Sequence, residues 1–334
     1  MWRYFEMLPV KDEKNIVSLE EGMTPIIPLN KLASRFDLTS LVMKDESKNP
    51  AGSFKARGMS AAVSKMKEFG IDRCIIPTAG NAGGALAAYC AKANIQCTVV
   101  MPEDAPEVFK KQCKHYDAEL ILVHGLINNC AIKVEEIKKQ KGIFNVSTMK
   151  EPYRLEGKKT MGYEIAEQLN WQLPDVIICP VGGGTGLIGI WKAFKELIEL
   201  GWIQEKLPRM IAVQIANCAP LFASYKDHAN WKEHFSPKPS IAYGLAVPYP
   251  FAMDLMHNVI NESKGEVITV TDDEINNAVR EIENEENILI SPEGAATWKA
   301  VIHLVAKKLI SKDEEVLLLN TGSDYKHLES LITA

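Results

Sequence analysis

The sequence predicts an α/β protein whose parallel sheets are flanked by helices. Two observations support this prediction: short β-rich runs alternate with longer amphipathic runs from residue 41 onward, and several β-rich runs are continuously apolar, as in strands covered on both faces. The 334 residues, 46% hydrophobic and 24% charged, are enough for about two domains. Active sites in such folds lie beyond the carboxyl ends of strands, where turns lead into helices.

Each expected strand is a short run rich in apolar and β-branched residues, and each expected helix is a longer amphipathic run. The expected strands are 41–44, 74–78, 97–102, 120–124, 144–147, 176–181, 210–215 and 316–320. The expected helices are 53–69, 81–94, 106–116, 128–140, 155–169, 186–200, 273–284 and 294–310. This alternation indicates right-handed crossovers between parallel strands.

Proline and charged residues at 150–157 mark an expected crossing between two domains. Residues 56–150, which contain four β/α units, are expected to form a small movable α/β domain. Residues 1–55 and 151–334 are expected to form a large α/β domain that binds the cofactor.

Composition and motif spacing exclude several classes of function. The net charge of −5 argues against a nucleic-acid partner, which would require a basic face. No apolar run reaches the roughly 18 residues of a membrane span, and the first residues lack the apolar core of a signal peptide. The seven cysteines form no CxxC pair and indicate reduced thiols in a cytoplasmic protein, and no histidine or cysteine motif indicates a metal site.

Lys55 lies in the stretch KDESKNPAGSFKARG, residues 44–58, where a turn over 49–52 leads into an expected helix with Ser53 as its N-cap. An ammonium in the first turn of a helix is electrostatically misplaced. A lysine amine that is desolvated or close to positive charge has a lowered pKa and can form a Schiff base with an aldehyde, and pyridoxal 5'-phosphate is the biological aldehyde that needs such a lysine. A surface lysine at a helix start is the alternative.

The turn TAGNAGG, residues 78–84, directly follows an expected strand and precedes an expected helix. Gly80 allows a tight turn, and Asn81 offers an amide to a ligand. We expect the backbone N–H groups of this loop to bind a carboxylate and Asn81 to bond a ring hydroxyl. A plain helix-capping role for Asn81 is the alternative.

The turn PVGGGTG, residues 180–186, stands in the same position after the strand 176–181. Its four glycines and one threonine can form a nest of backbone donors for a phosphate. The pattern is neither the dinucleotide-binding motif nor the P-loop motif. A purely structural bend is the alternative.

Taken together, the three turns resemble those of the fold-type II pyridoxal-phosphate enzymes of the tryptophan synthase β superfamily, and within it the threonine synthase group. The similarity runs over nearly the whole chain. Further segments that resemble the group are WRYFEMLPV (2–10), SLEEGMTPIIPL (18–29), EPYRLEGKKTMGYEIAEQ (151–168), SPEGAA (291–296) and NTGSDYKH (320–327).

The resemblance implies two open parallel or mixed sheets flanked by helices, a pyridoxal 5'-phosphate cofactor in the inter-domain cleft, and a homodimer. It assigns Lys55 as the Schiff-base lysine and general base, Asn81 to the ring hydroxyl of the cofactor, and Thr321 to the pyridine nitrogen. The implied phosphate cradle consists of Gly182, Gly183, Gly184, Thr185 and Gly186.

The resemblance also implies a small amino-acid substrate. The implied substrate-binding residues are Thr78, Ala79, Gly80, Ser147 and Arg154. The guanidinium fork of Arg154 suits a phosphate or carboxylate. The sequence departs from the group's pattern at Ala56, where the group has Asp, and at Ala79, where it has a hydroxyl residue. The gap between Ser147 and Arg154 is also longer.

The implied activity is that of a carbon–oxygen lyase of threonine biosynthesis, which converts O-phospho-L-homoserine and water, or a close anionic analogue, into L-threonine and phosphate. A serine/threonine ammonia-lyase is the first alternative, and Ala56 favours it because such dehydratases often carry an apolar residue there. Another β-elimination or replacement enzyme, or a non-catalytic binding module descended from an enzyme, remains open.

Overall fold

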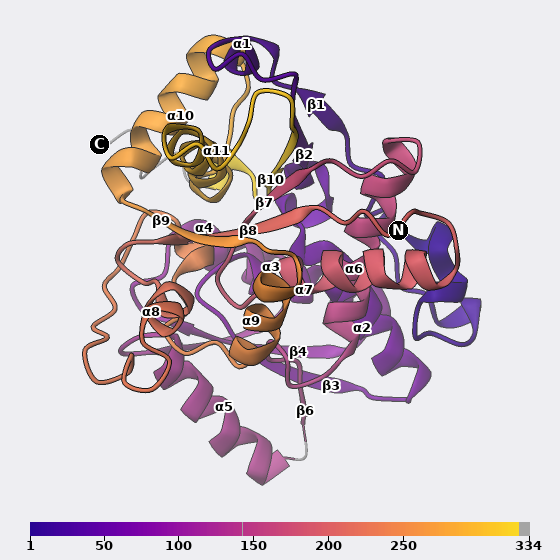
Figure 1. The fold of residues 1–334 in the computed structure, drawn as a ribbon. Helices are drawn as coiled ribbons and strands as arrows, with labels where there is room; N and C mark the ends of the chain where they lie inside the picture. The colour runs from indigo at the N-terminus through magenta and orange to yellow at the C-terminus, as the bar shows by residue number, and fades with distance from the viewer. Residues whose placement is uncertain (142, 327–334) are drawn as a thin grey trace. The chain divides into compact units, whose positions relative to one another are not determined.

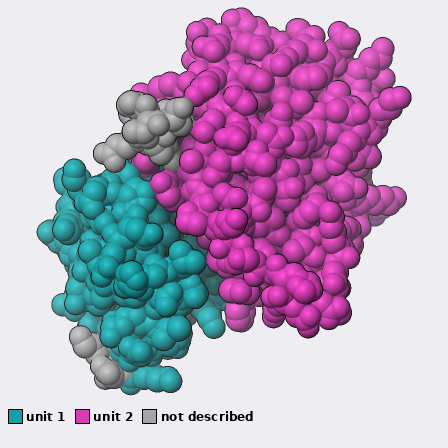
Figure 2. Space-filling view, turned by 90° about the vertical axis from the view of Figure 1, so that its left-hand side faces the viewer, with its two compact units in different colours: residues 1–23, 49–160 teal, residues 24–48, 161–334 magenta. Residues whose placement is uncertain are grey.

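The structure is a computed structural model that describes residues 1–141 and 143–326 (Figure 1). It divides into two compact units, which Figure 2 colours separately: unit 1 comprises Met1–Met23 and Asn49–Thr160, and unit 2 comprises Thr24–Lys48 and Met161–Ala334. The sequence predicts a small movable domain over residues 56–150 and a large domain formed by residues 1–55 and 151–334. This division stays a prediction. Residue 142 of the first expected domain and residues 327–334 of the second lie outside the described part of the chain. The latter include His327 of the segment NTGSDYKH.

Unit 1 contains a four-stranded parallel sheet with the strand order β5-β4-β3-β6. Its strands are β3 (Arg73–Pro77), β4 (Gln96–Pro102), β5 (Glu119–Val123) and β6 (Phe144–Asn145). Its helices are α2 (Lys55–Glu68), α3 (Asn81–Ala93), α4 (Glu107–His115), α5 (Ile127–Lys141) and the first part of α6 (Tyr153–Gln168). Ile75, Val100 and Val134 belong to the apolar core between this sheet and α5.

Unit 2 contains a six-stranded mixed sheet with the order β1-β2-β10-β7-β8-β9, in which only the β1–β2 pair is antiparallel. Its strands are β1 (Ile26–Pro28), β2 (Ser40–Asp45), β7 (Val176–Pro180), β8 (Arg209–Ile215), β9 (Glu266–Val270) and β10 (Glu315–Asn320). Its helices are α1 (Asn30–Ser34), α7 (Thr185–Glu199), α8 (Pro220–Lys226), α9 (Met253–Glu262), α10 (Asp272–Glu286) and α11 (Pro292–Ala306). In Figure 1, α10 and α11 lie together, and α11 packs on β7 and β10.

The structure confirms the predicted fold class, with two sheets flanked by helices, and each expected strand and helix overlaps an observed one. The prediction omitted the strands β1 and β9 and the helices α1, α8 and α9. β1 has three residues and α1 has five, and such short elements show no measurable periodicity. No helix within residues 1–141 and 143–326 is long and apolar enough to cross a membrane.

Two glycines let α2 and the unit 1 part of α6 approach each other backbone to backbone. A Cβ at Gly58 would lie 2.9 Å from the carbonyl oxygen of Arg154, and a Cβ at Gly157 would overlap the carbonyl group of Arg57. The buried Arg57 side chain donates from Nη1 to Thr160 Oγ1 at 3.1 Å. This close packing fixes α2, and with it the position of the residue at its start.

Candidate active site

Lys55 is the first residue of α2 and is half-buried. Its Nζ lies 4.5 Å from the centre of the Phe54 ring. The Nζ of Lys158, a side chain of α6 that is only 1% exposed, lies 3.0 Å from the centre of the same ring. The ring of Phe54 therefore contacts two lysine side chains, those of Lys55 and Lys158.

The turn before α2 differs from the prediction at Ser53. Ala51 and Gly52 have positive φ angles of 61° and 64°, and Ser53 is extended with φ −169°. The cap position of α2 is Phe54, so the prediction that Ser53 caps this helix is wrong. The Oγ of Ser53 is buried and has no hydrogen-bond partner among the described residues. A buried hydroxyl without a partner costs free energy, so Ser53 can stabilise a bound polar group two residues before Lys55.

The loop after β3 positions Asn81 as the first residue of α3, where Gly80 is the cap residue. Gly80 N–H donates to Thr78 Oγ1 at 3.1 Å, and Gly83 N–H donates to the Gly80 carbonyl at 3.1 Å. Asn81 is half-buried and follows Gly80, so Gly80 and not Asn81 occupies the N-cap position of α3. The segment Pro50–Gly52 that precedes Lys55 contacts α3, so unit 1 brings these two predicted turns into one neighbourhood.

Ser147 and Arg154 belong to one connected cluster in unit 1. The Nη1 of Arg154 donates to the Val146 carbonyl at 2.8 Å and to Thr148 Oγ1 at 3.2 Å. Ser147 donates to Asn145 from both its N–H, at 2.9 Å, and its Oγ. Burial lowers the pKa of Arg154. Through its two hydrogen bonds, the arginine holds the residues on both sides of Ser147 in place.

The loops that carry Ser147 and Asn81 follow neighbouring strands. Ile75 of β3 is the register partner of Asn145 of β6, and Val146 N–H donates to the Ile75 carbonyl at 2.9 Å. The carboxyl ends of parallel strands meet at one edge of a sheet, so the predicted substrate residues Thr78, Ala79, Gly80 and Ser147 gather at that edge. This is the position at which α/β folds bind ligands.

The glycine-rich turn of unit 2 lies between β7 and α7. Gly184 has φ +80° and is the cap residue of α7, which begins at Thr185. Ile188 N–H donates to the Gly184 carbonyl at 3.0 Å. Within the described part of the chain, the N–H groups of residues 182–187 donate no backbone hydrogen bond. These N–H groups at a helix N-terminus form a site that suits an anion such as a phosphate.

Gly182 and Gly244 make a close backbone contact that any side chain would prevent. A Cβ at Gly182 would lie 2.7 Å from the Gly244 carbonyl oxygen. Gly244 N–H donates to Glu293 Oε1 at 2.9 Å, and Glu293 is buried in the first turn of α11. The segment around Gly244 is thereby fixed against the predicted cradle on one side and against α11 on the other.

The same helix start is bonded to the end of β10, next to Thr321. Ser291 caps α11 by accepting from Gly294 N–H at 3.1 Å, and it donates to Asn320 Oδ1 at 2.9 Å. Asn320 Nδ2 donates to Asp45 Oδ1 at 2.9 Å. Thr321 follows directly and is buried. Unit 2 therefore brings the predicted cradle and Thr321 into one framework, which is built around the start of α11.

Gly244, Glu293 and Ser53 are the site residues that sequence reasoning did not identify. Gly244 and Glu293 are far apart in the chain and carry no motif of their own, although Glu293 lies within the matched segment SPEGAA. Glu293 could have been identified because it is an acidic residue in the first turn of an apolar helix. From that position its carboxylate can accept a hydrogen bond from a backbone N–H.

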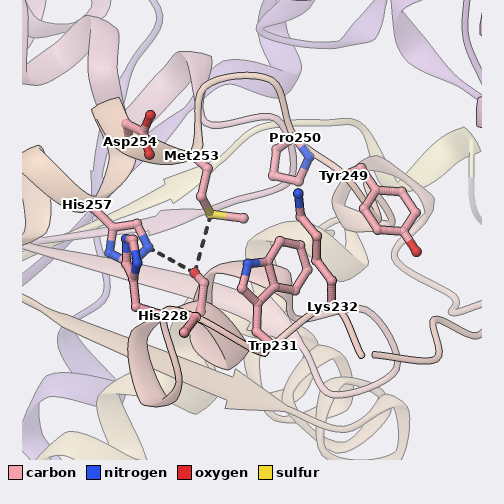
Figure 3. A pocket seen from close by; sticks show the side chains of 10 residues that line it. His228, Trp231, Lys232, Tyr249, Pro250, Met253, Asp254 and His257 are labelled. Carbon is pink, nitrogen blue, oxygen red and sulfur yellow. Dashed lines mark hydrogen bonds between the residues drawn. The ribbon is translucent and has the colours of Figure 1, made fainter. Parts of the chain in front are cut away.

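A separate cavity of about 400 Å³ lies in unit 2 beside α8 and α9 (Figure 3). Its walls include Trp231, Tyr249, Met253 and His257. The Oγ of Ser224 is 2.8 Å from Nε2 of His257. The cavity contains none of the residues that the sequence assigns to cofactor or substrate.

Comparison with known proteins identifies relatives over the full length of the chain. Residues 17–322 match the family described as pyridoxal-phosphate dependent enzyme. The protein named threonine synthase from Methanocaldococcus jannaschii is 35% identical, with 100% of this chain and 82% of the relative covered. The protein of the same name from Methanosarcina acetivorans is 33% identical, with 99% and 81% covered.

Solved structures show the same fold at lower identity. The processed form of threonine deaminase isoform 2 from Solanum lycopersicum has a TM-score of 0.78 at 21% identity, with 99% of this chain and 92% of that chain covered. Serine racemase from Dictyostelium discoideum has a TM-score of 0.72 at 25% identity, with 90% and 92% covered. The family match and the relatives that cover the whole chain agree: this chain belongs to the family of pyridoxal-phosphate-dependent enzymes, with pyridoxal 5'-phosphate as its cofactor.

Proposed function

We propose that this enzyme is a carbon–oxygen lyase similar to threonine synthase, which converts O-phospho-L-homoserine and water, or a close anionic amino-acid analogue, into threonine and phosphate. The observation that carries this proposal is full-length similarity, at 33–35% identity, to two proteins named threonine synthase. The amino-acid substrate is part of the same proposal, and so is a homodimeric assembly, which sedimentation would test.

The cofactor, when bound, withdraws electrons from the substrate and so loosens the bonds to its α-carbon. We assign Lys55 to carry it and to remove the α-proton as general base. Asn81 would donate to the ring hydroxyl of the cofactor. The N–H groups of residues 182–187 would hold its phosphate, with Gly182, Gly183, Gly184, Thr185 and Gly186 as the cradle. The hydroxyl of Thr321 would face the pyridine nitrogen and would leave that nitrogen without a proton.

Arg154 is our candidate for binding the anionic group of the substrate, together with the loop of Thr78, Ala79 and Gly80. Its Nη1 is engaged by the Val146 carbonyl and Thr148, but a guanidinium has five N–H donors in all. Its bonds on both sides of Ser147 also suit a positioning role, because they hold that loop at the same sheet edge as the loop after β3.

A serine/threonine ammonia-lyase is the second candidate function. Ala56 is fully buried in α2, directly after Lys55. It leaves no carboxylate at the position where the threonine synthase group has Asp. An apolar residue there removes one polar group that could orient a phosphorylated substrate.

Turnover of O-phospho-L-homoserine by purified holoenzyme tests the proposal. We expect phosphate and threonine to appear in equal amounts, and we expect Lys55→Ala to abolish both products and borohydride labelling of the chain. Lys67→Ala, which changes an exposed lysine of the same helix, is the matched control and should retain activity.

The alternatives give different products. Release of a keto acid and ammonia from serine or threonine, without phosphate release from O-phospho-L-homoserine, would replace the proposal with the ammonia-lyase. A protein that binds the cofactor through Lys55 but turns over neither class of substrate would contradict both.

A further inference from the structure

Three thiols of unit 1 that have no part in the proposed reaction lie together. Cys74 belongs to β3, Cys90 to α3 and Cys97 to β4. The Sγ atoms of Cys74 and Cys90 are 3.5 Å apart, and all three Sγ atoms lie within 4.8 Å of one another. Among the residues that the structure describes, no other group of three or more His, Cys, Asp or Glu side chains has this spacing.

The fold brings these thiols together. Cys74 and Cys97 are register partners on neighbouring parallel strands, so their side chains point to the same face of the sheet. Helix α3 connects the two strands and presents Cys90 to them near its carboxyl end. The separations along the chain form no recognisable metal motif, so sequence spacing alone cannot reveal the cluster.

We propose that Cys74, Cys90 and Cys97 form a binding site for a soft, thiophilic cation, with Cu(I) as the ion that fits it best. Thiolate ligands select Cu(I), zinc and iron–sulfur centres. An ion about 2.3 Å from each of three sulfurs places those sulfurs ~4 Å apart. The observed spacing requires only a small adjustment to reach that value.

The number of ligands distinguishes between the soft ions. A structural zinc site uses four ligands, whereas the described side chains supply three. Cys74 and Cys90 are fully buried and Cys97 is 7% exposed, so little room remains for water as a fourth ligand. Cu(I) is stable with three sulfur ligands.

Core packing is the competing explanation, because a buried free cysteine behaves as a small apolar side chain. Cys130 and Cys218 fit that explanation: each is buried outside the cluster, and burial raises the pKa of each thiol to about 11. Core packing alone gives no reason for three thiol sulfurs to lie within 4.8 Å of one another. These two cysteines therefore serve as matched controls.

Binding would change protonation but not oxidation state. Each sulfur binds as a thiolate and forms one copper–sulfur bond, any proton that it still carries leaves to solvent, and copper and sulfur both keep their oxidation states. Uptake therefore releases protons, and the affinity is expected to rise with pH.

Titration of reduced, anaerobic holoenzyme with Cu(I) in the presence of a competing chelator tests the proposal. We expect one copper per chain, and about a hundredfold or greater loss of affinity in Cys90→Ala and Cys97→Ala, since loss of even an outer-shell partner costs 10–100-fold. Cys130→Ala and Cys218→Ala should bind as the wild type does. Wild-type protein that yields all its copper to the chelator, or Cys90→Ala with unchanged affinity, would overturn the proposal.

X-ray absorption on copper-loaded wild-type protein provides a second measurement that requires no variant. A shell of three sulfurs at about 2.3 Å supports the site, and a shell of nitrogen and oxygen overturns it. Zinc uptake without Cu(I) uptake would overturn the assignment of the ion. These readouts are independent of the amino-acid reaction.

Discussion

At the scale of single residues, two glycines both have positive φ angles but lie in different surroundings. Gly184 has φ +80° at the start of α7, and Gly70 has φ +67° after α2. A Cβ at Gly184 would overlap the side chain of Met256, whereas a Cβ at Gly70 would meet nothing within 4 Å. The positive φ strains any other L-residue at both positions, but only Gly184 orients N–H groups toward the proposed phosphate.

Gly184→Ala and Gly70→Ala therefore form a matched pair. We expect Gly70→Ala to lower the free energy of unfolding by about 1–2 kcal/mol, and Gly184→Ala to lower it by more, because its Cβ must also displace Met256. Only Gly184→Ala should also weaken cofactor binding, by about tenfold or more, which corresponds to ~1.4 kcal/mol. Denaturant unfolding and titration of apoenzyme with pyridoxal 5'-phosphate measure the two effects. Equal cofactor affinity in the two variants would contradict the assignment of the cradle.

At the scale of elements, a buried ion pair joins β2 to the unit 2 part of α6. Lys44 and Glu164 are both fully buried, with Nζ 2.9 Å from Oε2. Lys44 also donates to the Thr24 carbonyl and to Gln168 Oε1, each at 2.7 Å. Its three donors are therefore used, which is the condition under which a buried pair can offset the cost of desolvation.

Removing one partner of this pair should be far worse than removing both. We expect Glu164→Leu to lower the free energy of unfolding by about 3–5 kcal/mol, and Lys44→Met with Glu164→Leu to recover much of that loss. The exposed pair Lys195–Glu262 offers a control: Lys195→Met should cost less than about 1 kcal/mol. Urea unfolding of the single and double variants measures these differences, and additive losses would refute a coupled pair.

The start of α10 should contribute a pH-dependent part of the stability. Burial raises the pKa of Glu274, but the hydrogen bonds from Thr271 N–H and His303 outweigh that effect and lower it below its usual 4.5. A lowered folded-state pKa stabilises the protein above pH 4.5, and that stability is lost as pH falls through the folded-state pKa.

We expect Glu274→Gln to lower the free energy of unfolding by about 0.5–1 kcal/mol at neutral pH. The difference from wild type should shrink as the pH falls below 4.5. Glu205→Gln, an exposed change elsewhere in unit 2, should show no such trend. Denaturant unfolding as a function of pH gives the result, and a difference that stays constant into acid would contradict the argument.

Elements with strong local signals could be predicted from the sequence, and long-range contacts could not. The strand before Asn81 and the helix after it were predictable because an apolar run, a glycine turn and an amphipathic run follow one another. Ser53 has the residue type of a cap, but the positive φ of Gly52 turns the chain so that its hydroxyl is buried instead. The Gly244–Glu293 bond joins two segments that only the folded sheet of unit 2 brings together.

At the scale of the whole molecule, the chain crosses between the units three times, after Met23, Lys48 and Thr160. The first segment completes unit 1 through the buried carboxylate of Glu21. It accepts from Trp2 Nε1 at 2.9 Å, and from Ser60 Oγ and Tyr89 OH at 2.6 Å each. A contiguous piece of unit 1 that lacks this segment would therefore leave Ser60 and Tyr89 without an acceptor.

Residues 1–23 joined to 49–160 by a short glycine–serine linker should fold as one cooperative unit. A short linker suffices because Gly22 N–H donates to Asn49 Oδ1 at 3.0 Å, which places the two cut ends close together. Residues 49–160 alone should be much less stable. Circular dichroism during urea unfolding compares the two, and equal stability would show that the first segment contributes little.

The position of β10 in the sheet has a consequence for how the polypeptide is made. β2 pairs with β10, and Asp45 bonds Asn320 across a separation of 275 residues. At a synthesis rate of about 5–20 residues per second, the nascent β2 waits roughly 15–55 seconds for this neighbour to leave the ribosome. Residues 49–160 are complete long before then, so we expect unit 1 to fold first, while the open edge of β2 is a natural target for a chaperone during translation.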